Sequence, residues 1–382
     1  MNVTVVGAGV SGLVAALTLA RAKVEATLLE EHGTIGLPCH CGGVVSPDYQ
    51  EKIGISVPRS VELMDLHGFR FTDGVRGVTV ESDRAIAKVI SRQALDEHLA
   101  GLCEEEGVEL LRSNRAESLR AREGRTVVET ASRAYTSDYA ILAGGIAENL
   151  GRSVGLARDR SGLLVSAQAV FRRRTESLVA SIYLSEHISP DFFGYVVPIG
   201  DQRCRIGVAS NEADVVGSLH VIAKKEGAET AEGMTTWAIW TGGPLRRTRS
   251  GNVFAVGDAA GMTKATTGGG IVFGSISARA VAGIIVGEMR GEASEGERLL
   301  RSAGDQLRKI RRMRRLMNAV GPASMMEALL SASSPEKLRN YMESVDFDFH
   351  GDMARAMGAL RFGPGLISAG ALALRHLIGG LC

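Results

Sequence analysis

The stretch NVTVVGAGVSGLVAALTLARAKVEATLLEE, residues 2–31, contains the pattern that decides the fold. Apolar and β-branched residues over Asn2–Val6 predict a buried strand, small residues over Gly12–Ala22 predict a helix, and Val24–Glu30 predicts a second strand. The order of strand, glycine turn, helix and strand is typical of a βαβ unit that binds a dinucleotide.

The glycines and acids of this unit each have a physical role in such a site. The first glycine permits a tight turn, the second lets a pyrophosphate approach the backbone, and the third lets the helix pack closely on the strand. Phosphate then lies at the helix N-terminus, and an acid at the end of the second strand accepts hydrogen bonds from ribose hydroxyls. The residues expected to contact the dinucleotide are Gly7, Gly9, Ser11, Gly12, Glu30 and Glu31.

A second glycine-rich turn reads GDAAGMTKATTGGGI over residues 257–271, between a predicted strand and a helix of small residues. Asp258 is placed to accept a hydrogen bond from a hydroxyl of the dinucleotide, and backbone N–H groups near the triple glycine face a flavin's carbonyl end. For this stretch alone, an acidic helix cap and an ordinary turn are the alternative. With the N-terminal unit, the pattern favours FAD, bound by Asp258, Gly268, Gly269, Gly270 and Ile271.

Composition excludes several classes of protein. The chain has 382 residues, enough for two subdomains, and a net charge of +1, which gives no global reason to expect nucleic acid as a partner. No uninterrupted apolar run reaches the length of a membrane span, and the glycine motif begins too early to leave room for a signal peptide. Five scattered cysteines make a poor disulfide framework, so we expect a reducing cytoplasm.

The pattern becomes β-rich near residue 163. We expect an α/β fold: a Rossmann-like FAD-binding domain over 1–162 and 244–292, an inserted antiparallel β-sheet substrate domain over 163–243, and a helical C-terminus over 293–382. The first domain is expected to contain a helix at Arg92–Glu106 and strands that return to the first sheet at Val108–Arg112, Thr126–Thr130 and Tyr135–Leu142. The predicted strands of the insert are Leu164–Phe171, Val179–Leu184, Phe193–Pro198 and Cys204–Ala209.

The two glycine turns together resemble those of the FAD-dependent aromatic hydroxylase superfamily, in which GDAA ends a late strand. Arg92, which opens the helix SRQALD, resembles the flavin-contacting arginine of that superfamily, although a surface helix arginine is the alternative. The resemblance also places Ala143 and Gly144 at the flavin. Many members have an aspartate in this segment and this chain has Ala-Gly-Gly, so the electron donor stays open between NAD(P)H and a protein carrier such as ferredoxin.

Within that superfamily, the motifs are most similar to those of the geranylgeranyl reductase family, particularly its archaeal branch that acts on isoprenoid ether lipids. The segments IGLPCHCG (35–42) and GDAAGMTKATTGGGI resemble the family's IGxPxxC and GDAAGxxKPTTGGGI, with Ala265 in place of proline. FGYVVP (193–198) stands where the family has YxWxFP. The resemblance implies catalytic and flavin-contacting roles for Cys41 and Gly42, and a substrate-cavity wall at Phe193, Tyr195, Val197 and Pro198.

The resemblance implies that reduced flavin delivers hydride from N5 to one carbon of a prenyl double bond, while a proton goes to the other. Cys41 would position the alkene or assist proton delivery; a buried, inert thiol is the alternative. Two other functions stay open. One is a flavin-dependent monooxygenase of the aromatic hydroxylase type, and the other is a non-catalytic flavin- and isoprenoid-binding protein.

Two further segments bear on metals and membranes. Cys39-His40-Cys41 lacks a second ligand pair at zinc-like spacing, so no metal site is expected. RKIRRMRR over 308–315 is a basic amphipathic helix that suits anionic lipid headgroups, although a solvated face paired with acids is slightly favoured. The apolar segment Gly363–Cys382 suits docking, oligomer packing or a membrane surface. The expected location is therefore the cytoplasm, with peripheral contact at the inner face of the membrane as an option, and no oligomeric state is indicated.

Overall fold

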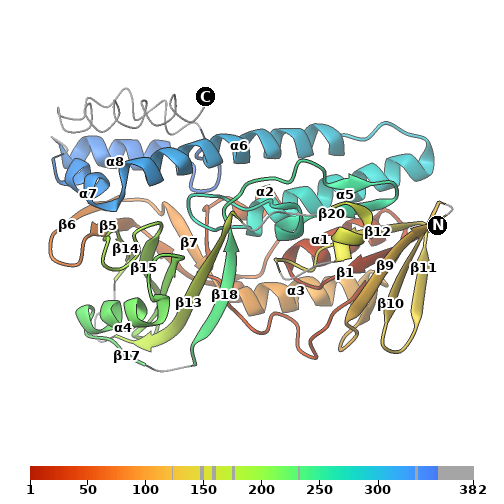
Figure 1. Ribbon diagram of the computed structural model, residues 1–382, viewed down its shortest axis with the longest axis horizontal. Helices are drawn as coiled ribbons and strands as arrows, with labels where there is room; N and C mark the ends of the chain where they lie inside the picture. The colour runs from red at the N-terminus through yellow and green to blue at the C-terminus, as the bar shows by residue number, and fades with distance from the viewer. Residues whose placement is uncertain are drawn as a thin grey trace.

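The computed structural model describes residues 1–122, 124–146, 150–156, 161–173, 177–230, 233–331 and 334–351. The apolar segment Gly363–Cys382 lies outside the described residues. Figure 1 shows an elongated molecule with two β-rich halves and a long helix, α6 (Gly296–Val320), that runs along both of them.

A six-stranded sheet in one half contains the N-terminal βαβ unit. Its strands pair in parallel, except that β19 is antiparallel to β20 at the edge. Four of the five residues of β1 are buried, as expected for a parallel strand covered on both faces. The strand order is β19 (Arg249–Ser250), β20 (Val253–Ala255), β12 (Tyr139–Leu142), β1 (Asn2–Val6), β2 (Glu25–Leu29) and β8 (Glu109–Leu111).

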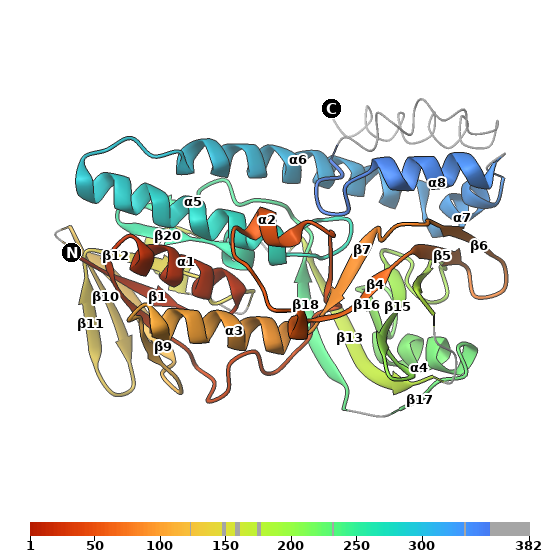
Figure 2. The same ribbon diagram turned by 180° about the vertical axis from the view of Figure 1, so that it is seen from behind.

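Two helices of this half, α1 (Val10–Arg21) and α3 (Arg92–Glu105), begin and end within two residues of the predicted bounds. A third helix, α5 (Ile271–Arg290), follows the second glycine turn, as predicted. α1 packs against both of the others, as Figure 2 shows from behind. The approach of α1 to α5 depends on small residues, because a Cβ on Gly274 would lie 2.5 Å from Ser11 Oγ. The Rossmann-like unit predicted from the sequence is therefore confirmed.

The predicted place of Thr126–Thr130 in the first sheet is wrong. This segment is strand β10 (Arg125–Thr130), which forms a separate antiparallel sheet with β9 (Ala116–Arg122) and β11 (Ala134–Ser137). Side chains along β10 alternate between buried and more exposed positions, which is typical of an antiparallel sheet with one solvent-exposed face. The predicted strand Tyr135–Leu142 is also only partly right: its first residues belong to β11, and only the more uniformly buried β12 returns to the six-stranded sheet.

An eight-stranded sheet forms the second half. Its pairs are antiparallel except β14 with β5, and helix α4 (Val215–Lys225) packs against β13 and β16. β5 and β6 precede residue 163, so the sheet also draws on the segment assigned to the first domain, and the domain boundaries remain a prediction. Along the sheet lie β17 (Glu229–Thr230), β13 (Leu163–Arg172), β16 (Arg203–Ser210), β15 (Phe193–Gly200), β14 (Val179–Tyr183), β5 (Gly68–Thr72) and β6 (Gly77–Glu81), with β18 (Thr235–Trp240) paired to β13.

The remaining elements are a small sheet, four short helices and the helices of the C-terminal region. A small sheet has the strand order β3 (Val44–Val45), β7 (Ala87–Ile90) and β4 (Glu62–Leu66). Four short helices pack on elements of the first half: α2 (Tyr49–Ile53) and η3 (Gly257–Ala260) on α5, η1 (Arg59–Val61) on α3, and η2 (Leu150–Val154) on β9. The described part of the C-terminal region is helical, as predicted: α6 packs on α5 and is followed by α7 (Pro322–Leu330) and α8 (Pro335–Ser344).

Candidate functional site

A cavity of about 320 Å³ lies where the two halves meet. One side of its wall contains residues of the N-terminal turn, of the Asp258 turn and of residues 35–43, which we call the cysteine loop. The other side is formed by β13, β15, β16 and β18 of the eight-stranded sheet. The cavity therefore joins a polar, glycine-lined side to an apolar, aromatic side.

The three glycines of the N-terminal turn have different surroundings. Gly7 adopts a φ of +99°, and a Cβ there would lie 2.7 Å from the carbonyl oxygen of Ala143. A Cβ on Gly12 would lie 1.8 Å from the carbonyl oxygen of Gly7. A Cβ on Gly9 would instead meet nothing within 4 Å, and Gly9 lines the cavity. Gly7 and Gly12 therefore support the turn, whereas Gly9 leaves open space through which a ligand can reach the backbone.

Two helix N-termini meet at the cavity wall. α1 begins after Gly9 and α5 after Gly270, and neither N-terminus has a side-chain cap in the described part of the chain. The first N–H groups of a helix are unpaired within the helix and carry partial positive charge. Asp258 lies beside the second terminus, where its Oδ1 accepts a hydrogen bond from Thr263 Oγ1 at 2.9 Å. This side of the cavity is thus suited to phosphate and hydroxyl groups.

Glu30 is held by the protein itself. Its Oε2 accepts a hydrogen bond from the backbone N–H of Ala8 at 2.7 Å, and its Oε1 accepts from the N–H of His32 at 2.9 Å. Oε1 also contacts His32 Nδ1 at 2.7 Å, whereas Oε2 has a second acceptor position for a ribose hydroxyl. The ribose contact stays a prediction. Glu31 is exposed, and Arg115 lies 3.6 Å from it.

Arg92 is the first residue of α3, whose N-cap Ser91 accepts a hydrogen bond from the N–H of Ala94. The guanidinium lies against buried Asp96, with Nη2 at 2.8 Å from Oδ2. Burial opposes the charge of Arg92, yet Asp96 and the nearby cysteines hold the pKa of the guanidinium above its ordinary value. Arg92 Nε is buried, lacks a hydrogen-bond partner among the described residues, and belongs to a residue of the cavity wall.

The cysteine loop is fixed from behind by a buried cation. Arg205 on β16 donates a hydrogen bond to the carbonyl oxygen of Gly42 at 2.7 Å. Gly43 has a φ of +70°, and a Cβ there would lie 2.4 Å from the carbonyl oxygen of Ile90. Cys41 accepts a weak hydrogen bond from the N–H of Gly43 and lines the cavity. Cys39 is also a free thiol, but it is not part of the cavity wall.

Aromatic residues face this loop from the eight-stranded sheet. Tyr195 lies opposite Gly207 across the β15–β16 pair, where the missing side chain gives its ring space. Its hydroxyl donates to Gln168 Oε1 at 2.6 Å, and burial raises the pKa of the phenol, so the proton stays on it. The His40 ring stacks on Trp237 with centroids 4.2 Å apart. Burial, and then the charge of Arg92, lower the pKa of His40 to about 4, which keeps it neutral.

The structure brings most of the predicted site residues to one cavity wall, but not all of them. Six lie outside the wall: Gly7, Gly12, Glu30, Glu31, Gly144 and Pro198. The three glycines belong to the glycine turn or contact it, the two acids follow β2, and the proline alternates with the wall residues along β15. The residues on the wall are Gly9, Ser11, Cys41, Gly42, Arg92, Ala143, Phe193, Tyr195, Val197, Asp258, Gly268, Gly269, Gly270 and Ile271.

Several residues of the wall were not predicted, among them Phe69, Gln168 and Trp237. Trp237 could have been noticed in the sequence, because the chain has two tryptophans and both lie in β18, shortly before the Asp258 turn. Phe69 and Gln168 stand in no local sequence pattern that indicates a site. Among the described residues, no group of three or more His, Cys, Asp or Glu side chains is placed to hold a metal ion.

Comparison with known proteins gives one matching family model and several similar individual proteins. Residues 5–75 match the family model of an NAD(P)-binding Rossmann-like domain. The chain is 26% identical over 314 residues to digeranylgeranylglycerophospholipid reductase 2 of Methanothermobacter thermautotrophicus, covering 78% of this chain and 80% of that protein. It is 27% identical over 319 residues to digeranylgeranylglycerophospholipid reductase 1 of Methanopyrus kandleri, covering 77% and 81%.

The fold is similar to that of solved flavoproteins. A geranylgeranyl bacteriochlorophyll reductase-like protein of Thermoplasma acidophilum superposes with a TM-score of 0.81 at 18% identity, covering 97% of this chain and 98% of that one. The halogenase PltM, solved with FAD and phloroglucinol, has a TM-score of 0.66 at 13% identity, covering 97% and 94%. These matches confirm the predicted α/β fold, and the curated relatives confirm the resemblance to geranylgeranyl reductases.

Proposed function

We propose that the protein is an FAD-dependent reductase that saturates double bonds in the geranylgeranyl chains of lipids. One observation carries the proposal: a single cavity wall contains both glycine turns, the Cys41 loop and the aromatic face of β15. The similarity to named digeranylgeranylglycerophospholipid reductases over more than three quarters of the chain supports the same substrate class.

The residues present fit FAD. Open space at Gly9 and the uncapped N-terminus of α1 suit the pyrophosphate, and Asp258 suits a hydroxyl of the chain that joins it to the flavin. The buried and unpartnered Nε of Arg92 is a donor that a bound cofactor would satisfy. Within the triple glycine, the N–H of Gly268 donates to the carbonyl oxygen of Lys264 and the N–H of Gly269 donates to Thr267 Oγ1. We therefore assign the flavin's carbonyl end to the N-terminus of α5, at Gly270.

When bound and reduced, the flavin supplies hydride to one carbon of the double bond. The protein contributes an apolar wall that holds an isolated alkene and excludes water, formed in part by Phe193 and Val197. A proton must reach the second carbon. Tyr195 and Cys41 are the candidate sources on the wall. Burial raises the pKa of the Tyr195 phenol, so that group keeps its proton. Cys41 also serves to position the alkene.

The electron donor in this proposal is NAD(P)H or a protein carrier such as ferredoxin. The sequence contains no second glycine unit like residues 7–12 that would hold a nicotinamide cofactor permanently. We therefore assign reduction to a donor that binds transiently.

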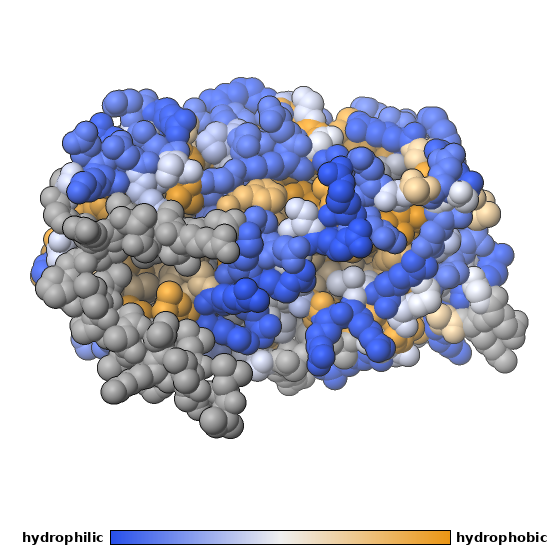
Figure 3. Space-filling view, turned by 90° about the horizontal axis from the view of Figure 1, so that it is seen from above, coloured by the Kyte–Doolittle hydropathy of each residue, from blue (hydrophilic) through white to orange (hydrophobic). Residues whose placement is uncertain are grey.

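Peripheral contact with the cytoplasmic face of a membrane is part of the proposal, because a lipid substrate must leave a bilayer to enter the cavity. Helix α5 is long and apolar enough to cross a membrane, but 78% of its apolar window is buried, so it is a core helix. Arg311, Arg312 and Arg315 are exposed on α6, whereas Arg314 is buried over the Phe192 ring. Figure 3, viewed from the α6 side, shows a face that is mainly hydrophilic and has small apolar patches between the hydrophilic residues. Anionic lipid headgroups suit these cations.

The test begins with the absorption spectrum of the purified protein, in which a flavin band is expected. The bound flavin is then reduced with dithionite without oxygen, and a geranylgeranyl lipid is added in excess. Reoxidation of the flavin by the lipid, and none by a fully saturated lipid, is the expected result. A missing flavin band, or reoxidation that requires oxygen and hydroxylates the product, would contradict the proposal.

A further inference from the structure

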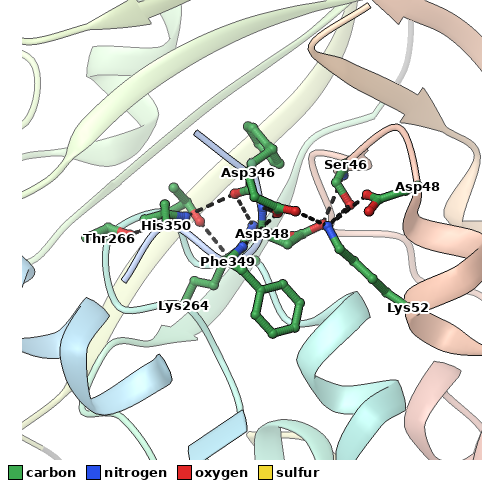
Figure 4. A network of polar contacts seen from close by, with 12 residues as sticks. Ser46, Asp48, Lys52, Lys264, Thr266, Asp346, Asp348, Phe349 and His350 are labelled. Carbon is green, nitrogen blue, oxygen red and sulfur yellow. Dashed lines mark hydrogen bonds and ion pairs between the residues drawn. The ribbon is translucent and has the colours of Figure 1, made fainter. Parts of the chain in front are cut away.

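A buried ion pair borders the cavity and has no role in the proposed chemistry so far. Lys264 Nζ lies 2.6 Å from Asp348 Oδ1, and the two side chains are 2% and 3% exposed. Both residues belong to the cavity wall, together with Asp258 and the triple glycine. Figure 4 shows that Asp348 comes from a segment after α8 that reaches back to the second glycine turn.

Several contacts hold this segment, residues 346–350, in place. Asp348 Oδ2 accepts a hydrogen bond from the N–H of Ser46 at 2.9 Å, next to the strand that follows the cysteine loop. His350 and Thr266 share a hydrogen bond of 2.7 Å, and Asp346 pairs with Lys52 (Figure 4). The segment therefore ties the second glycine turn to the cysteine loop, which are two walls of the same site.

Asp348 is ionised in this setting. Burial alone would raise the pKa of its carboxyl, but the Lys264 ammonium and the hydrogen bonds from Ser46 hold that pKa below its ordinary value. The Lys264 ammonium also lies 4.5 Å from the centroid of the Phe347 ring. The pair is thus a fixed positive and negative charge shielded from water.

Lys264 supports the triple glycine from behind. Its N–H donates to the carbonyl oxygen of Gly269 at 3.0 Å, and its own carbonyl accepts from the N–H of Gly268 at 2.8 Å. A Cβ on Gly269 would lie 2.6 Å from Lys264 Cε and 3.1 Å from Nζ. The Lys264 side chain therefore packs against Gly269, next to the N-terminus of α5 that we assign to the flavin's carbonyl end.

Stability is a weak explanation for this pair, because replacing a buried ion pair with apolar side chains is often neutral or stabilising. A charge in a dry site acts more strongly on a neighbouring redox group than it would in water. We propose that the Lys264–Asp348 pair sets the reduction potential of the flavin, with Asp348 as a positioning residue that balances and holds the Lys264 ammonium. This inference rests on the proposed function.

The test is the reduction potential of the bound flavin in the flavin-loaded protein. Asp348→Asn leaves the Lys264 charge unbalanced, which favours the anionic reduced flavin, so the potential is expected to rise. Lys264→Met leaves Asp348 unbalanced and is expected to lower the potential or leave it unchanged, and the double variant is expected to lie closer to the wild type than Asp348→Asn does. Mere loosening of the site would move both single variants in the same direction.

Matched controls are available in the same segment. Asp346→Asn and Lys52→Met remove the same charges from the neighbouring pair, which does not line the cavity, and are expected to leave the potential unchanged. Lys264→Arg keeps the charge and should stay near the wild-type potential even if Lys264→Met fails to fold. No rise in Asp348→Asn, or shifts of the same sign in both single variants, overturns the inference. A wild type without flavin would instead contradict the proposed function.

Discussion

Gly9→Ala separates the binding role of the glycine turn from its structural role. A Cβ on Gly9 meets no atom within 4 Å, and the backbone there is extended, with a φ of −74° and a ψ of 175°. Alanine adopts this conformation without strain, so the cofactor-free protein should unfold at the same temperature as the wild type or slightly above it. A gain of about 0.4–1 kcal/mol is typical for such a substitution.

The added methyl group of Gly9→Ala occupies the space that we assign to the approaching pyrophosphate. An extra methyl in a close-packed contact costs roughly 1–3 kcal/mol. At about 1.4 kcal/mol for each tenfold change, FAD affinity should fall roughly 5- to 150-fold. Quenching of FAD fluorescence on binding measures the dissociation constant, and a thermal unfolding scan of the same FAD-free sample measures stability.

Gly12→Ala is the matched control, since its Cβ would lie 1.8 Å from the carbonyl oxygen of Gly7. It should lower the unfolding temperature of the FAD-free protein, which Gly9→Ala should not. If Gly9→Ala bound FAD as tightly as the wild type, the assignment of this turn to the pyrophosphate would be refuted.

Three further predictions concern the cavity wall and its supports. Cys41→Ser should retain FAD but reduce lipid turnover, measured as a steady-state rate, roughly a hundredfold. Cys39→Ser is the control, because Cys39 is not on the cavity wall, and it should leave turnover nearly unchanged. An equal fall in both variants would contradict the catalytic role of Cys41. Arg205→Met removes the donor that holds the cysteine loop, so turnover should fall while the FAD dissociation constant stays within about threefold, a split that a global loss of structure would not give. Burial lowers the pKa of His350 from 6.5 to about 4. Below pH 6.5 the unfolded chain therefore takes up a proton that the folded chain does not. The free energy of unfolding should fall by up to roughly 3 kcal/mol as the pH approaches 4. In His350→Gln, the free energy of urea unfolding should lose this part of its pH dependence. The same dependence on pH in the variant and the wild type would disprove the role of His350.

The parts of the fold that local patterns determine were predictable from the sequence. The βαβ unit, α3 and α5 follow from hydrophobic periodicity and from glycines at positions where a Cβ would clash. The strand at 126–130 was misplaced because its pattern distinguishes a strand from a helix but not one sheet from another.

The remainder of the site depends on contacts between residues far apart in the chain. Arg205 meets the cysteine loop 163 positions away, and Asp348 meets Lys264 across 84 positions. Neither residue lies in a recognisable local pattern, and a buried charge in the sequence looks the same as an exposed one. Phe69 reaches the cavity because β5 joins the eight-stranded sheet, a pairing that no turn signal indicates.

The most direct test of the central claim is mass spectrometry of the lipid product. Flavin-loaded protein reduced with dithionite is incubated without oxygen with digeranylgeranylglycerophospholipid, the substrate class of the relatives. The predicted result is a series of products that each gain two hydrogens per saturated double bond, and none with heat-denatured protein. Lipid that binds but keeps its original mass, while the flavin remains bound and reduced, would contradict the reductase and identify a binding protein instead.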